Sequence, residues 1–76
     1  MRIETVNGRD LVCEHFFKAH EIKAGQRWAP ADGSDHEVKI VSVNGDVVKY
    51  QWEEQGQRKT HEKSSFAFQC RYCKVL

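Results

Sequence analysis

The sequence contains few cysteines, a single proline and almost no net charge. Its 76 residues include three cysteines, and 12 basic residues are nearly balanced by 11 acidic ones, which leaves a charge of +1. Such a balance argues against a DNA mimic, which needs a large acidic excess, and against a strongly basic coat for nucleic acid. No apolar run approaches the roughly 20 residues of a membrane span. We therefore expect no membrane partner.

The start of the chain also lacks a secretion signal, because the first residues are mostly polar and contain no apolar core. We therefore expect a cytoplasmic protein. In that reducing compartment, cysteines are more often free thiols or metal ligands than disulfides. A chain of 76 residues has room for one domain, and it buries only about 60 % of the surface that it exposes when unfolded. Domains of this size often depend on a metal, disulfides or a second subunit, so a monomer and a homodimer both stay open.

The clearest structural signal is the Asn44-Gly45 pair between two segments rich in β-branched and aromatic residues. This pattern is the strongest short-range indicator of a β-hairpin, here over residues 38–52. A three-residue loop ending at a left-handed Gly45 would place Ile40 opposite Val48. That register creates one continuous apolar face, which a slip of one residue would destroy.

Shorter segments with strand character lie on both sides of this hairpin. We expect a first strand around Trp28, a polar edge strand over residues 57–62, a helical turn capped near residues 64–65 and a last strand over residues 71–75. Five short strands in this order, with a long loop after the first and the helical turn before the last, predict a mainly β chain with a small SH3-like barrel over residues 24–76.

Residues 1–23 are expected to form an extension that packs on the barrel. Asn7-Gly8 is a second hairpin-type turn, which predicts two strands within about residues 2–17. Alternatively, Asp10 caps a short helix that runs to about Ala19, with apolar residues on one face at helical spacing. The sequence leaves the hairpin and the helix open.

The same segments carry a resemblance to a known group of proteins. The matching motifs are Ala24-Gly25-Gln26-Arg27-Trp28, the hairpin of residues 38–52, Ser65-Phe66-Ala67-Phe68 and Arg71-Tyr72. With this pattern, residues 22–76 resemble short SH3-like proteins of tailed phages and prophages, most of which have no known function. The resemblance implies an SH3-like fold and a phage or prophage origin.

A more distant similarity is to the small plasmid-encoded dihydrofolate reductases, which are also SH3-like barrels of this length. Those enzymes have a Val-Gln-Ile-Tyr strand at the active pore, and this chain has no such segment. The missing strand argues against that activity.

The sharpest candidate for chemistry is a zinc site formed by Cys13, His15, Cys70 and Cys73. Cys-x2-Cys is half of a common structural zinc site, and Cys13 with His15 or His20 would complete a Cys3His set. A metal that joins the two ends would stabilise a small chain. However, an extended strand would turn Cys70 and Cys73 to opposite faces, and the alternative is that the thiols act as small hydrophobes. We expect no cofactor and keep zinc as the alternative.

No set of residues indicates catalysis. The sequence has no glycine-rich phosphate loop, no nucleophile elbow and no carboxylates at a recognisable catalytic spacing. The nearness of Cys13 and His15 in sequence does not supply the geometry of a catalytic pair. We therefore predict a protein that is not an enzyme.

The expected function is binding of another macromolecule. We predict a module that contacts a host or phage protein, because a charge near zero favours protein association, and that modulates host machinery. The expected surface contains Asp32, Asp35, Trp52, Arg58 and Lys59. Trp52 is expected to be partly exposed opposite His36, which is itself expected to carry no chemistry.

The alternative function is that of a zinc-stabilised nucleic-acid-binding module. Its contacts would come from Lys63, Arg71 and Lys74, beside aromatic side chains on which bases stack. A steep loss of affinity with salt would distinguish phosphate contacts from a protein interface.

Overall fold

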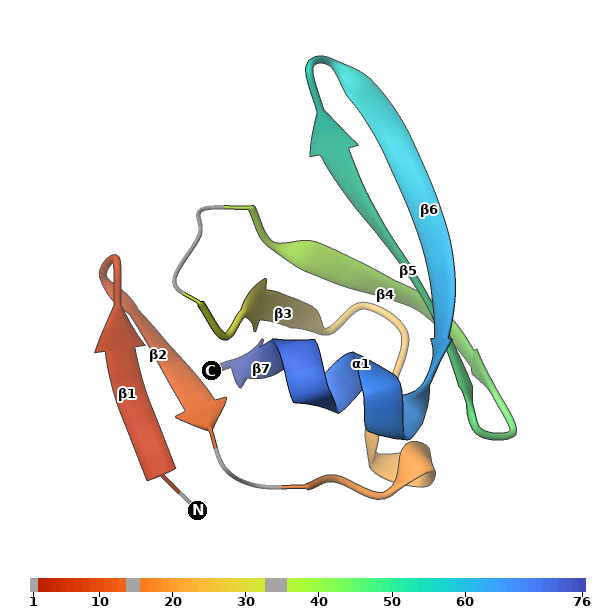
Figure 1. Cartoon of the computed structure of the whole chain (residues 1–76), viewed down its shortest axis with the longest axis horizontal. Helices are drawn as coiled ribbons and strands as arrows, with labels where there is room; N and C mark the ends of the chain where they lie inside the picture. Colours follow the sequence, from red (N-terminus) through yellow and green to blue (C-terminus); the bar gives the residue numbers. More distant parts are fainter. Residues whose placement is uncertain (1, 14–15, 33–35) are drawn as a thin grey trace.

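The computed structural model of the chain describes residues 2–13, 16–32 and 36–76 (Figure 1). Most of this chain is β-structure, as the sequence predicts. The elements in chain order are β1 (Arg2–Val6), β2 (Arg9–Cys13), the 3-10 turn η1 (Ala19–Glu21), β3 (Arg27–Pro30), β4 (Val38–Asn44), β5 (Val47–Glu54), β6 (Gln57–Ser64), α1 (Ser65–Arg71) and β7 (Tyr72–Val75).

The seven strands form one antiparallel sheet in the order β1-β2-β7-β3-β4-β5-β6. β1 and β6 stand at its two ends and do not pair with each other, so this sheet is not closed. The hairpin of β5 and β6 extends well beyond the start of β4, as Figure 1 shows. α1 contacts β5, β6 and β7. The strand pairing therefore supports a mainly β fold without establishing a closed barrel.

The N-terminal segment forms the hairpin and not the helix that would begin after Asp10. Asn7 and Gly8 have φ values of 53° and 76°, as a two-residue type I′ turn requires. β2 continues into the main sheet by pairing with β7, where Leu11 lies opposite Val75. The first two strands are therefore part of the same sheet as the rest of the chain.

The central hairpin of β4 and β5 is confirmed, but its predicted register is wrong. The turn is the two-residue Gly45-Asp46 with Gly45 at φ 62°, and Ile40 lies opposite Tyr50 instead of Val48. A glycine at the first turn position is typical of a type II′ turn, which matches the twist of the flanking strands.

A β-bulge at Val41 explains how this register still produces an apolar face. The pairing shifts between Ile40 and Ser42, so Val41 is left without a partner and its side chain is 38 % exposed. Ile40 and Val43 can then both face the core although they are three positions apart in sequence. The predicted apolar face is present, but the bulge lies in the strand and not at the turn.

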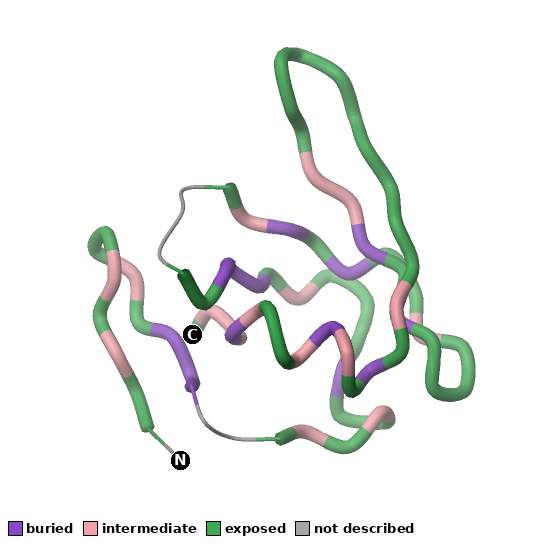
Figure 2. Tube along the Cα trace, viewed as in Figure 1, coloured by how far each residue is buried: buried purple, intermediate pink, exposed green. Residues whose placement is uncertain are grey.

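Two clusters of buried side chains form the core. The larger one lies under α1 and the centre of the sheet and contains Ile22, Trp28, Val38, Ile40, Val48, Tyr50 and Phe68. The smaller one joins the N-terminal hairpin to β7 and β3 and contains Leu11, Cys13, Ala29 and Cys73. In Figure 2 the buried segments run through β3, β4, β5 and α1, whereas β6 is almost entirely exposed.

α1 begins where the sequence predicts a helical turn. Ser64 is the N-cap, and its side chain accepts a hydrogen bond of 3.2 Å from the Ala67 N–H. Phe68 is the residue by which α1 enters the core, whereas Phe66 is 66 % exposed. Across the described residues, no helix combines the length and apolar character that crossing a membrane requires.

Candidate functional site

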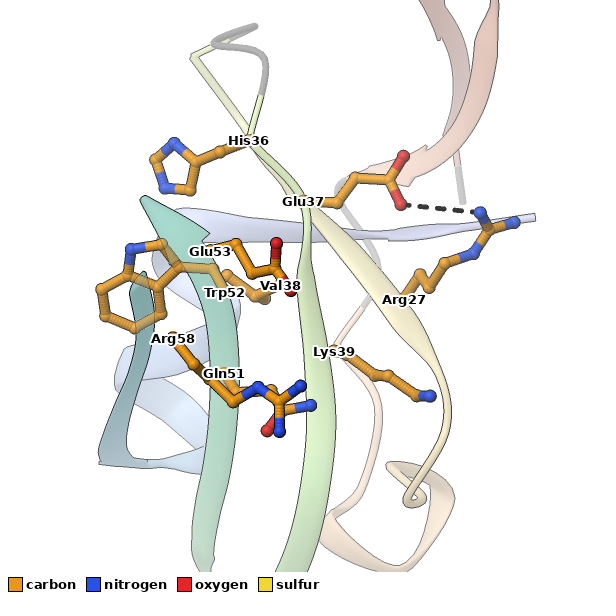
Figure 3. Close-up of a pocket in the computed structure, with 9 residues that line it drawn as sticks. All are labelled: Arg27, His36, Glu37, Val38, Lys39, Gln51, Trp52, Glu53 and Arg58. Atoms are coloured by element: carbon orange, nitrogen blue, oxygen red, sulfur yellow. Dashed lines mark ion pairs between the residues drawn. The ribbon is translucent and has the colours of Figure 1, made fainter. Parts of the chain in front are cut away.

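A groove of about 380 Å³ lies where β5 and β6 extend past the start of β4. Because β4 begins at Val38 and β5 continues to Glu54, the last residues of β5 pair with β6 alone. Nine residues from β3, β4, β5, β6 and the segment before β4 line the groove (Figure 3). The groove is therefore a consequence of unequal strand lengths.

The two sides of the groove differ in character. Lys39 lies opposite Gln51, and Glu53 lies opposite Arg58, so these polar side chains share one face of the sheet. Trp52 belongs to the other face. Figure 3 shows its ring on the same side as His36, away from Lys39. A bound segment would therefore meet an aromatic wall and a charged wall.

Trp52 is held in a defined orientation at the aromatic wall. Its ring stacks on Tyr50 with 5.7 Å between centroids and lies 6.3 Å from the His36 ring. Its indole N–H donates a 3.2 Å hydrogen bond to a carboxylate oxygen of Glu54. Trp52 is half-buried, which confirms the expected partial exposure. The observed register, with Lys39 opposite Gln51, places Val38 opposite Trp52 in place of the expected His36.

Aromatic contacts continue from Trp52 into the core. The ring centroids of Tyr50 and Tyr72 are 5.5 Å apart, and the Tyr72 ring stacks on that of Phe68 with 4.8 Å between centroids. Burial, with a smaller contribution from Tyr72, raises the pKa of the Tyr50 phenol to about 12. The phenol is therefore protonated at neutral pH, and Trp52 stacks on a neutral, buried ring.

The charged wall carries an excess of positive charge. Glu37 is already paired with Arg9 and, at 3.8 Å, with Arg27. Lys39 and Arg58 have no carboxylate partner in the described part of the chain. Two cations are therefore available to a ligand on the charged wall.

A second hollow of about 390 Å³ adjoins the groove, because His36 lines both. Asp32 lies in this hollow with Arg71 and Tyr72. The burial of Tyr72 raises the pKa of its phenol, so this side chain is also a neutral hydrogen-bonding group. The two hollows therefore meet at His36.

The residues predicted for partner binding are placed unevenly on this surface. Trp52 and Arg58 line the groove, and Asp32 reaches the adjoining hollow. Lys59 is exposed on β6 opposite Trp52, but it does not line the groove. Asp35 lies outside the described residues.

The cations of the nucleic-acid alternative lie apart from one another. Lys63 is half-buried on β6, and Arg71 lines the hollow at the end of α1. The Lys74 ammonium lies 5.6 Å from the centroid of the Phe17 ring, in a different pocket. These three side chains do not share one pocket.

The cysteines of the zinc alternative are divided between two environments. Cys13 and Cys73 are buried with their sulfur atoms 3.0 Å apart, whereas Cys70 is exposed on α1. His15 lies outside the described residues, and the residues that are described include no group of three or more His, Cys, Asp or Glu side chains able to hold a metal. Burial, and then the Cys73 thiol, raises the pKa of Cys13 to about 12, which disfavours the thiolate that zinc requires.

Several residues of the groove could not be found from the sequence. Arg27 and Lys39 belong to segments that indicate strands and not a binding site, and His36 and Glu37 belong to no motif. These four residues meet because β3, β4 and β5 pair side by side. The sequence did indicate that Trp52 and His36 both lie at the open end of the central hairpin, and their rings are 6.3 Å apart in the structure.

No protein-family model matches the chain, and no curated protein or solved structure shows significant similarity to it. The resemblance to SH3-like phage proteins therefore stays a prediction, and function has to be argued from the groove.

Proposed function

We propose that the chain is a non-enzymatic binding module that holds an extended acidic segment of a partner protein in the groove at Trp52. The observation that carries this proposal is a half-buried, oriented indole that lines the same groove as Lys39 and Arg58, two cations without a carboxylate partner in the described part of the chain. In the light of the resemblance to phage proteins, the partner is a protein of the bacterial host, whose machinery the module modulates.

Trp52 has the properties of an interface anchor. Tryptophan and arginine dominate the energetics of many protein interfaces, and truncation of one such residue often lowers affinity by about 2 kcal/mol or more. The stack on Tyr50 and the hydrogen bond to Glu54 restrict the indole before a partner arrives. Binding therefore loses little side-chain entropy at Trp52.

The charges of the groove favour a peptide over a nucleic acid. Glu37 and Glu53 lie among the lining residues, and a phosphate backbone, which carries a charge at every nucleotide, would bring negative charges next to both. A short acidic segment can pair with Lys39 and Arg58 and still keep its own charges away from both glutamates. A protein ligand is therefore the better match.

We also propose that β3 to β7 form an open SH3-like barrel. β3 pairs with both β4 and β7, the strands β4, β5 and β6 follow as a meander, and a helical segment precedes β7. This order is the one predicted from the sequence. The groove then lies beside the loop between the first two strands of the barrel.

The proposal is tested by selecting ligands from a displayed library of random peptides. We expect the selected peptides to be rich in Asp and Glu around one apolar residue. Trp52→Ala should weaken their binding at least about 30-fold, which corresponds to about 2 kcal/mol. Phe66→Ala is the matched control, because Phe66 is an exposed aromatic side chain outside the groove lining.

Single-stranded DNA serves as the competing ligand in the same assay. Tighter binding of an oligothymidine than of the selected peptides, with a steep dependence on salt, would favour the nucleic-acid alternative. Peptide binding that is equally sensitive to Trp52→Ala and Phe66→Ala would remove the groove as the binding site.

A further inference from the structure

Cys13 and Cys73 face each other across two strands although 60 positions separate them in sequence. β2 and β7 pair so that Leu11 lies opposite Val75 and Val12 opposite Lys74. The same register places Cys13 opposite Cys73. Strand pairing, and not sequence proximity, brings the two thiols together.

The backbone at this pair suits a cross-strand disulfide. The Leu76 N–H donates a 2.9 Å hydrogen bond to the Asp10 carbonyl, which makes residues 10 and 76 a hydrogen-bonded pair. Hydrogen-bonded and non-hydrogen-bonded pairs alternate along antiparallel strands, so Cys13 and Cys73 form a non-hydrogen-bonded pair. The Cα atoms of such pairs are about 4.5 Å apart, within the range that disulfides span.

The two sulfur atoms are already close to bonding distance. They lie 3.0 Å apart, and a disulfide bond is about 2.05 Å long. Both side chains are 7 % exposed and belong to the small core cluster with Leu11 and Ala29. The pair can therefore react within the native fold, provided that the oxidant is small.

We propose that Cys13 and Cys73 are a peroxide-sensitive dithiol whose disulfide locks the N-terminal hairpin onto β7. The Cys73 sulfur, which accepts the hydrogen bond from the Cys13 thiol, loses its proton and attacks the peroxide; the O–O bond breaks, and a sulfenic acid and one water are formed. The Cys13 thiol then attacks the sulfenic sulfur, the S–S bond forms, the S–O bond breaks, and the hydroxyl group leaves as a second water that carries the proton of the Cys13 thiol. Two electrons pass from the two thiols to the peroxide, and a thiol such as glutathione returns them.

The environment of Cys13 makes this reaction selective. Its thiol lies 3.6 Å from a carboxylate oxygen of Glu4 and is shielded from large reagents by burial. Cys70, in contrast, is exposed on α1 and is open to any thiol reagent. The buried pair therefore stays reduced unless a small oxidant reaches it.

The lock would act on a weakly attached part of the sheet. In the described part of the chain, β2 and β7 form the only strand pairing between the N-terminal hairpin and the rest of the sheet, and this pairing is short. A covalent bond at Cys13 fixes the free end of this pairing. Oxidation should therefore raise the melting temperature and slow amide exchange in the hairpin.

The test uses the full chain with Cys70→Ser, treated with hydrogen peroxide, denatured and alkylated. We expect no alkylatable thiol after oxidation, a mass lower by two hydrogens, and a fragment that joins Cys13 to Cys73. The melting temperature should rise and should return to its original value with dithiothreitol. The matched control is Cys13→Ser, in which peroxide should neither raise the melting temperature nor form a crosslink within the chain.

Two results would overturn the proposal. One is that Cys70→Ser protein keeps two alkylatable thiols after oxidation, or accumulates sulfinic acid instead of the disulfide. The other is that the disulfide forms without a change in melting temperature or in amide exchange of residues 2–13. Neither readout depends on a binding partner, so this test is independent of the proposed function.

Discussion

Trp52 and Trp28 show how the same side chain takes different roles in different surroundings. Trp28 is 1 % exposed, and its ring packs edge-on against that of Phe68 with 5.1 Å between centroids. Trp52 is half-buried and keeps part of its ring at the groove. At the residue scale, the degree of burial separates a core residue from a binding residue.

Substitution of the two tryptophans should therefore have unequal effects. Trp28→Ala should lower the free energy of unfolding by about 3–5 kcal/mol, as expected for a large buried aromatic residue. Trp52→Ala should lower it by about 1–2 kcal/mol, because part of its surface is already in water. Urea denaturation measures both values. Equal losses would place Trp52 in the core and would argue against its role as an anchor.

The pKa of Cys13 predicts a decline of stability in alkaline solution. Burial, and then the Cys73 thiol, raises this pKa to about 12, from the value of 9.0 for an unperturbed thiol. Above pH 9 the unfolded chain loses this proton while the folded chain keeps it, so deprotonation favours unfolding. Burial of Tyr50 acts in the same direction.

We therefore expect the free energy of unfolding of the reduced protein to be constant near neutral pH and to fall as the pH rises above 9. Urea titrations at a series of pH values measure this decline. Cys13→Ser should make it shallower, since serine does not titrate in this range. If the pH dependence is the same in Cys13→Ser, burial does not raise the pKa of the Cys13 thiol.

The backbone of β6 alternates between groups that bond to β5 and groups that face away from it. The Ser65 N–H donates a 2.8 Å hydrogen bond to the Asp46 carbonyl, which fixes the alternation of hydrogen-bonded pairs along β5 and β6. The backbone groups of His61 therefore point toward β5, whereas those of Thr60 point away from it. As an end of the sheet, β6 presents alternate open backbone groups and charged side chains that discourage further pairing.

Proline substitution distinguishes these two backbone orientations. Thr60→Pro removes an N–H that bonds no strand. It should be tolerated, because proline is found on edge strands where the missing N–H would face solvent. His61→Pro removes a hydrogen bond to β5 and leaves the Tyr50 carbonyl without its donor. His61→Pro should therefore lower the free energy of unfolding by about 1–3 kcal/mol more than Thr60→Pro does. Thermal or urea unfolding of the two variants measures the difference, and similar losses would contradict the assigned alternation.

At the scale of the whole molecule, stability should be distributed unevenly over the sheet. The larger core cluster lies beneath β3, β4 and β5, and the smaller one attaches the N-terminal hairpin through β7. β1 has a strand partner on one side alone, and the side chain of Ile3 is 51 % exposed. The N-terminal hairpin, and β1 above all, is therefore packed less firmly than the centre of the described sheet.

Hydrogen exchange measures this distribution directly. In the reduced protein, the amides of β1 should exchange faster than those of β4 and β5, because strands with few buried contacts open most easily. Mass spectrometry after proteolysis resolves these segments. Equal protection in β1 and β4 would show that the hairpin unfolds only together with the whole sheet.

The sequence by itself determined those features that depend on neighbouring residues. Asn7-Gly8 and Asn44-Gly45 indicated turns because glycine and asparagine tolerate positive φ, Ser64 lay at a helix start, and the polar run after Gly56 was an edge strand. The position of Trp52 at the open end of the central hairpin also indicated that it is partly exposed.

Only the tertiary structure decided the features that depend on long-range pairing. The bulge at Val41, the choice of a hairpin over a helix after Asp10, and the contact of Cys13 with Cys73 all follow from how distant strands pack against a shared core. His36 and Arg58 meet at the groove for the same reason. Local backbone preferences cannot specify such contacts, because their energy comes from side chains that are far apart in the sequence.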